Sequence, residues 1–161
     1  MFARIVGNTP LWVWPLLLAL LWLGFDQTRA RVVGLRRILL LPAVMTGLSL
    51  SGAMTSFGAG PLVLLVWSIA VCIGTGLAVK RPAVSLARYD PATALFHLPG
   101  SWAPLALILG IFSAKYATGA TLAMQPALAA SIEFSTLVSA VYGVFSGIFV
   151  GRAIRLWRLR R

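Results

Sequence analysis

Residues 61–79 read PLVLLVWSIAVCIGTGLAV, an uncharged apolar run that stops at the basic pair Lys80-Arg81. A hydrocarbon core about 30 Å thick needs roughly 20 apolar helical residues to cross it once. Further stretches of the same character occupy about residues 11–25, 38–56, 101–124 and 132–150. We therefore predict an all-α integral membrane bundle of five transmembrane helices, and we expect residues 1–161 to form a single domain.

The Lys and Arg residues outside these stretches lie on alternate connections. They are Arg29, Arg31, Arg36 and Arg37 after the first stretch, Lys80, Arg81 and Arg88 after the third, and Arg152, Arg155, Arg158, Arg160 and Arg161 after the fifth. Arg4 alone lies on the opposite side, and Lys115 lies inside the fourth stretch. Because short loops rich in Lys and Arg stay in the cytoplasm, the N-terminus is predicted outside and the C-terminus cytoplasmic.

The net charge of +11 would suggest nucleic acid in a soluble chain, but here the charges gather at one membrane face. Anionic lipid headgroups attract each such Lys or Arg by about 1 kcal/mol. We expect lipid-headgroup contacts from Arg29, Arg36, Arg37, Arg81, Arg88, Arg155 and Arg158. Membrane lipids, anionic on the cytoplasmic side, are the expected partners, and nucleic acid is not.

The connection from Lys80 to Gly100 is too apolar for a free loop. Its apolar residues are Val84, Leu86, Tyr89, Leu95, Phe96 and Leu98. Asp90-Pro91 has the form of a helix N-cap followed by proline in the first turn. We therefore predict a short interfacial helical segment here, between the third and fourth spans.

Small residues recur every four positions in three of the stretches, which lets neighbouring helix backbones approach closely. They are Ser135, Ser139, Gly143, Gly147 and Gly151 in the fifth, Ala106, Gly110, Ala114 and Thr118 in the fourth, and Ala43, Gly47, Ser51 and Thr55 in the second. We infer a tight interior of spans 2, 4 and 5 with span 1 at the periphery. Packing within the chain is favoured for the glycine stripe of span 5, and a homo-oligomer interface is the alternative.

Residues suited to catalysis are few. The acidic residues are Asp26, Asp90 and Glu133, and His97 is the single histidine. Asp26, Asp90 and His97 could converge on a metal or acid–base site, although such residues more often cap helices or pair with arginine. No recognisable catalytic motif is present, so we expect no enzyme activity, no cofactor and no bound metal.

Lys115 is the charge that most needs an explanation. An ammonium at the centre of a span costs about 2.5 to 3.5 kcal/mol on insertion scales. Its four-carbon stem could carry it to the outer headgroups. Alternatively it pairs with Glu133, with Tyr116 and Ser113 beside it, and lines an outward-opening pocket for an anionic ligand or a proton relay. Both interpretations remain open.

Several short motifs resemble a known family. They are Thr9-Pro10, Leu41-Pro42, Ser49-Leu50-Ser51-Gly52, Arg88-Tyr89, Pro99-Gly100-Ser101-Trp102 with Pro104-Leu105, Lys115-Tyr116 and Gly151-Arg152. Together they resemble an uncharacterised family of small bacterial multi-pass inner-membrane proteins, catalogued as a domain of unknown function. The resemblance implies a bacterial cytoplasmic membrane and a shared fold, and it supplies no activity, ligand or partner.

Two functional classes follow from these observations. The first is a small binding or transport bundle whose polar pocket is built around Lys115 and Glu133, and we favour it because a lysine inside a span requires an explanation. The alternative is an accessory or regulatory protein that holds a membrane-protein partner through the span 5 glycine stripe and the basic cytoplasmic face. A membrane enzyme ranks third.

Overall fold

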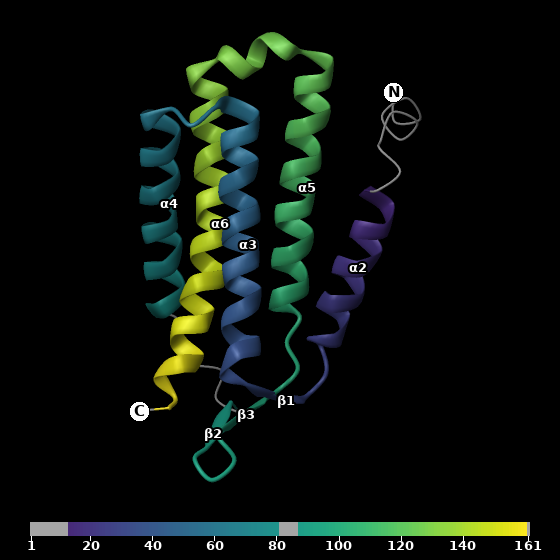
Figure 1. The fold of residues 1–161 in the computed structure, drawn as a ribbon, viewed down its shortest axis with the longest axis vertical. Helices are drawn as coiled ribbons and strands as arrows, with labels where there is room; N and C mark the ends of the chain where they lie inside the picture. Colours follow the sequence, from purple (N-terminus) through teal and green to yellow (C-terminus); the bar gives the residue numbers. More distant parts are fainter. Residues whose placement is uncertain (1–12, 81–86, 161) are drawn as a thin grey trace.

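A computed structural model describes residues 13–80 and 87–160. In chain order its elements are α2 (Val13–Asp26), β1 (Arg31–Gly34), α3 (Leu35–Phe57), α4 (Pro61–Lys80), β2 (Arg88–Asp90), β3 (Leu95–Leu98), α5 (Ala103–Met124), the 3₁₀ helix η1 (Pro126–Ala130) and α6 (Ile132–Arg158) (Figure 1). The mostly helical fold confirms the prediction from the apolar stretches, whereas the small sheet departs from the predicted all-α class.

The helices α3, α4, α5 and α6 are each long and apolar enough to cross a membrane, which makes the chain a multi-pass membrane protein. The first predicted span, 11–25, corresponds to α2, which has 14 described residues, or about 21 Å of helix. Residues 11 and 12 lie outside the described part of the chain. A fifth crossing by α2 and the sidedness of the two termini stay predictions.

Helix α6 extends well past its predicted end at residue 150. Ser131 caps its N-terminus, because the serine hydroxyl accepts a hydrogen bond from the backbone N–H of Phe134 at 3.3 Å. The helix continues to Arg158 because the last turns consist of residues such as Arg and Leu that favour helix. Arg152 and Arg155 therefore stand on a rigid helix rather than on a tail.

The glycine stripe of α6 packs against α4. A methyl group added at Gly143 would lie 2.5 Å from the carbonyl oxygen of Trp67, and one at Gly147 would collide with the carbonyl oxygen of Val71. One at Gly151 would lie 2.6 Å from the side chain of Ala78. Side chains of ordinary size would push the two helices apart, so the stripe is used within the chain.

The predicted interior was wrong in one respect. Helix α6 lies at the centre of the bundle, but its closest neighbour is α4, followed by α3, and its contact with α5 is smaller (Figure 1). The small residues of span 2, namely Ala43, Gly47, Ser51 and Thr55, are all exposed. The buried face of α3 instead carries Ile38, Met45, Ser49 and Ala53. A row of small residues permits close packing, but it does not determine which face of a helix turns inward.

Helix α2 lies at the periphery, as predicted, and packs on α5 (Figure 1). The contact is close at Gly24, where an added methyl group would lie 2.5 Å from a methyl carbon of Leu105. The outer face is open, with the side chain of Trp22 75% exposed.

The segment predicted as an interfacial helix folds instead as a β-hairpin in its described part. Strand β3 pairs in antiparallel fashion with β2 and with β1, giving the order β1-β3-β2. At the turn, Asp90 accepts a hydrogen bond from the N–H of Ala92 at 3.0 Å and another from the hydroxyl of Thr93 at 2.8 Å. The aspartate therefore closes a turn rather than capping a helix, which is an equally ordinary use of Asp before Pro.

The sheet is attached to the bundle through Phe96. Its side chain is fully buried and packs with Val33 of β1, Ile38 of α3 and Ala153 of α6. Its neighbour His97 points outward, because alternate residues of a strand face opposite sides. The hairpin thus brings the connection after α2, the start of α3 and the end of α6 together at one end of the molecule (lower end of Figure 1).

Candidate functional site

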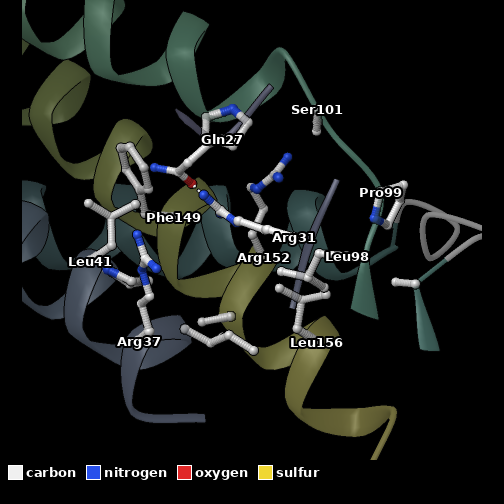
Figure 2. A pocket seen from close by; sticks show the side chains of 15 residues that line it. Gln27, Arg31, Arg37, Leu41, Leu98, Pro99, Ser101, Phe149, Arg152 and Leu156 are labelled. Atoms are coloured by element: carbon white, nitrogen blue, oxygen red, sulfur yellow. Dashed lines mark hydrogen bonds between the residues drawn. The ribbon is translucent and has the colours of Figure 1, made fainter. Parts of the chain in front are cut away.

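A cavity of about 80 Å³ lies at this end of the bundle (Figure 2). Its polar lining comes from Gln27, Arg31, Arg37, Ser101 and Arg152, and most of the remaining wall is apolar. The space is several times the roughly 10–15 Å³ that a single water requires. We call it the basic pocket and define it by Arg31, Arg37 and Arg152.

Arg31 is held at the pocket wall by Gln27. Its Nη2 donates to the Gln27 Oε1 at 2.8 Å (dashed in Figure 2). Gln27 is only 6% exposed, and its backbone carbonyl accepts the N–H of Ser101 at 3.0 Å. Burial lowers the pKa of Arg31, nearby Asp26 raises it, and Arg37 lowers it again. A guanidinium stays charged in proteins regardless, so Arg31 is an oriented cation.

Asp26 supplies the carboxylate of this region. Its Oδ2 lies 3.3 Å from Nη2 of Arg37 and 3.7 Å from Nη1 of Arg31. The side chains of Asp26 and Arg37 are 45% and 62% exposed. Ion pairs this exposed contribute about 0–1 kcal/mol. A single carboxylate thus faces two arginines, and the local charge stays positive.

Arg152 carries the third charge of the pocket. It is partly buried on α6, and within residues 13–80 and 87–160 no hydrogen bond or ion pair engages its guanidinium. Arg31 and Arg155 act on it as like charges. Figure 2 shows the guanidinium groups of Arg31 and Arg152 near one another in the pocket. Taking a cation out of water is costly unless an anion compensates it, so this arrangement favours an anion beside Arg152.

Most of the arginines predicted to contact lipid headgroups are exposed. The exposed ones are Arg29, Arg36, Arg37, Arg88 and Arg158. Arg29 also lies 5.8 Å over the ring of Phe25. Arg155 is partly buried in the last turn of α6, and Arg81 lies outside the described residues. The headgroup contacts themselves stay a prediction.

Asp26, Asp90 and His97 do not form a joint site. Asp26 pairs with arginines, Asp90 closes the hairpin turn, and His97 is exposed on β3. Across the described residues, no group of three or more His, Cys, Asp or Glu side chains is placed to hold a metal ion. The three residues of the predicted weak polar site therefore do not lie together. The two carboxylates have separate structural roles.

Lys115 reaches sideways to α3. Its Nζ donates to the carbonyl oxygen of Leu48 at 2.7 Å and lies 5.9 Å from the centre of the Tyr142 ring. Gly52 makes room for the side chain, because a methyl group there would lie 2.6 Å from Nζ. The ammonium is thus engaged by residues of α3 and α6 near the middle of α5.

The other residues predicted around Lys115 are more dispersed. Glu133 is exposed in the first turn of α6. The ion pairs found among the described residues all involve Asp26, so the expected pair between Lys115 and Glu133 is not formed. The ring of Tyr116 stacks on Phe112 at 6.2 Å, and Ser113 is exposed. Lys115 is not among the residues that line the basic pocket.

Sequence reasoning missed the combination of Gln27, Arg31 and Arg152. The charge pattern places Arg31 and Arg152 at the same membrane face, but nothing in their spacing indicates that they share a cavity. One local signal was present, because Gln27 and Arg31 are only four residues apart in the sequence and bond directly. Arg152 joins them only through the tertiary fold.

The fold and the pocket together define a small multi-pass membrane bundle with arginines gathered at one end. A model of a family of unknown function, DUF6622, matches residues 1–161, so the chain belongs to that family. The resemblance to an uncharacterised family is thereby confirmed. No curated protein and no solved structure matches the chain.

Proposed function

We propose that this protein binds a phosphate-class anion in the basic pocket at the cytoplasmic end of its bundle. The observation that carries the proposal is the partly buried Arg152, which shares the pocket with Arg31 and has no carboxylate partner among the described residues. The anion could be the headgroup of a membrane lipid or a free phosphate, since both present the same oxygens.

The chemistry of the pocket suits such a ligand. Planar guanidinium groups bind phosphate oxygens in bidentate fashion, with hydrogen bonds about twice as strong as neutral ones. Arg31 is already oriented by Gln27, which reduces the entropy lost on binding. Helix α3 begins beside the pocket, and its N-cap residue Gly34 makes no side-chain capping bond. The free N–H groups of such a helix start favour nearby negative charge.

We propose the same sidedness as the charge pattern predicts. The chain would cross the bacterial cytoplasmic membrane five times, with the N-terminus outside and the basic pocket facing the cytoplasm. What supports this is that the arginine-bearing start of α3 and end of α6 lie at one end of the molecule (Figure 1). A reporter fused after Arg161 should be active in the cytoplasm, and activity in the periplasm would refute the orientation.

The other predicted functions have less support. A binding or transport pocket around Lys115 and Glu133 stays a prediction, but Leu48 and Tyr142 already engage the ammonium. An accessory role in which a partner docks on the glycine stripe would require α4 to leave, because α4 covers Gly147. We propose no enzymatic role.

The proposal is tested by titrating inorganic phosphate into the protein in phosphatidylcholine nanodiscs while following thermal unfolding. Phosphate should raise the midpoint, because a ligand that binds only the folded state stabilises it. Arg152→Gln should weaken binding about 10- to 100-fold, the effect of losing one charged hydrogen-bonding partner. Arg160→Gln, an exposed arginine near the end of the same chain, is the matched control.

A second arm distinguishes the two sources of phosphate. If the ligand is a lipid headgroup, nanodiscs that contain phosphatidylglycerol should reproduce the stabilisation without added phosphate, and Arg152→Gln should reduce that stabilisation. If only dissolved phosphate acts, the ligand is soluble. The proposal fails if Arg152→Gln binds phosphate as tightly as the natural protein.

A further inference from the structure

A second hollow lies between α3 and α6 and is almost entirely apolar. Its volume is about 400 Å³, within the range of ligand sites. It is lined from α3 by Leu39, Ala43 and Thr46 and from α6 by Val150, Ile154 and Trp157. We call it the apolar groove. It shares Pro42 and Ala153 with the basic pocket but otherwise uses different residues.

The groove opens toward the outside of the bundle. Leu39 is 46% exposed and Trp157 42% exposed, and Ala43 is also exposed. The hydroxyl oxygen of Thr46 is buried, so it adds no accessible polar group to the surface of the groove. Both helices are long and apolar enough to cross a membrane. The groove therefore presents a hydrocarbon surface at the depth of lipid acyl chains.

A hydrocarbon surface alone does not select a ligand in a bilayer. Lipid tails are as apolar as leucine, so a chain in the groove gains packing contacts but no hydrophobic driving force. Any preference for one lipid over another must come from the groups near the groove's end. The charges there decide what binds.

Two arginines flank the end of the groove. Arg36 precedes Leu39 by three residues on α3, and Arg158 follows Ile154 by four on α6, spacings that place side chains on adjoining parts of a helix surface. Both arginines are exposed, and neither belongs to an ion pair among the described residues. Trp157 beside them is a residue type typical of the membrane interface. Positive charge at this level complements a phosphate headgroup.

We propose that the apolar groove with Arg36 and Arg158 is a binding site for one anionic phospholipid of the surrounding bilayer. One acyl chain lies along α3 and α6 in the groove, and the phosphate lies between the two arginines. The site is separate from the basic pocket and does not depend on anion binding there.

Native mass spectrometry of the detergent-purified protein, titrated with phosphatidylglycerol or phosphatidylcholine, tests this site. Phosphatidylglycerol should bind more tightly. Arg36→Gln and Arg158→Gln should each weaken its binding about fivefold, the effect of about 1 kcal/mol per charge, and should leave phosphatidylcholine almost unchanged.

Filling the groove tests the acyl-chain contact. Ala43→Leu should weaken both lipids about tenfold, because the larger side chain displaces about ten carbon contacts. Ala117→Leu, the same change at an exposed position of α5, is the control and should have no effect. Since Ala43 is exposed, the change should not prevent folding.

Two results would overturn the proposal. One is lipid binding that neither Ala43→Leu nor the double variant of Arg36 and Arg158 alters. The other is a wild-type dimer that Ala43→Leu dissociates without loss of bound lipid, because a second copy of the chain would then occupy the groove. Arg152→Gln should leave unchanged the lipid binding that Ala43→Leu weakens, so failure here is distinguishable from failure of the basic pocket.

Discussion

At the scale of the residue, Arg152 has an unusual environment for a charged side chain. It is partly buried, Arg31 and Arg155 repel it, and no carboxylate in the described part of the chain pairs with it. Removing an uncompensated charge from such a place can stabilise a protein. Residues held in unfavourable surroundings are often those that a ligand contacts.

Arg152→Gln should therefore increase stability when no anion is present. We expect a gain of about 1 kcal/mol in the free energy of unfolding, measured in phosphatidylcholine nanodiscs in phosphate-free buffer. The exposed Arg160→Gln should change it by less than about 0.5 kcal/mol. A clear loss of stability in Arg152→Gln would mean that the arginine holds the fold together.

Asp26 competes with any anion for Arg31 and Arg37, since its Oδ2 lies 3.7 Å and 3.3 Å from them. Asp26→Asn should tighten phosphate binding about fivefold, because an exposed ion pair of about 1 kcal/mol no longer has to be broken. Calorimetric titration measures this, with Asp90→Asn on the hairpin as the control. Weaker binding in Asp26→Asn would show that the carboxylate organises the pocket.

At the scale of the element, the β2–β3 hairpin has a pH-sensitive turn. The hydroxyl of Thr93 lowers the pKa of Asp90, with further help from the N–H of Ala92. Because the folded value lies below the unfolded one, the ionised carboxylate stabilises the hairpin above about pH 4. This contribution is lost as the pH falls through the lowered pKa.

Amide hydrogen exchange in β3 should accordingly quicken as the pH is lowered below about 4, relative to the intrinsic rate. Thr93→Val should bring the pKa of Asp90 closer to its ordinary value and move this loss of protection to higher pH. An Asp90 titration, followed by NMR, that is the same in both proteins would contradict the assigned role of the hydroxyl.

The packing of α4 against α6 should be disrupted by a single methyl group added at a glycine of the contact. Gly147→Ala places a methyl group against the backbone at Val71 and should destabilise the fold by about 1–3 kcal/mol. Gly47→Ala meets no atom within 4 Å and should stabilise α3 slightly, because alanine favours helix over glycine. Thermal unfolding compares the two variants, and equal stability would argue against the close α4–α6 contact.

Sequence patterns predicted some elements better than others. The long apolar runs located α3 to α6 because helices that cross lipid need length and hydrophobicity, both visible in the sequence. The hairpin was missed because Asp90-Pro91 suits a helix start and a turn equally. The row of small residues that contains Gly47 is exposed, although it was predicted to face the interior. Spacing shows which residues share a helix face, but it does not show whether another helix covers that face.

At the scale of the whole molecule, the proposed anion site depends on residues brought together from distant parts of the chain. Gln27 and Arg31 follow α2, Arg37 lies in the first turn of α3, and Arg152 lies near the end of α6. The hairpin around Phe96 ties these parts together. Charge pattern predicted that basic residues share one end, but only the fold shows which of them meet in a cavity.

The central claim is that an anion lies between Arg31 and Arg152. The most direct test is a crystal structure grown with selenate, a phosphate-like anion whose selenium can be located by anomalous scattering. We predict an anomalous peak in the basic pocket within hydrogen-bonding distance of both guanidinium groups. A pocket without the peak, or a carboxylate of the chain paired with Arg152, would contradict the account.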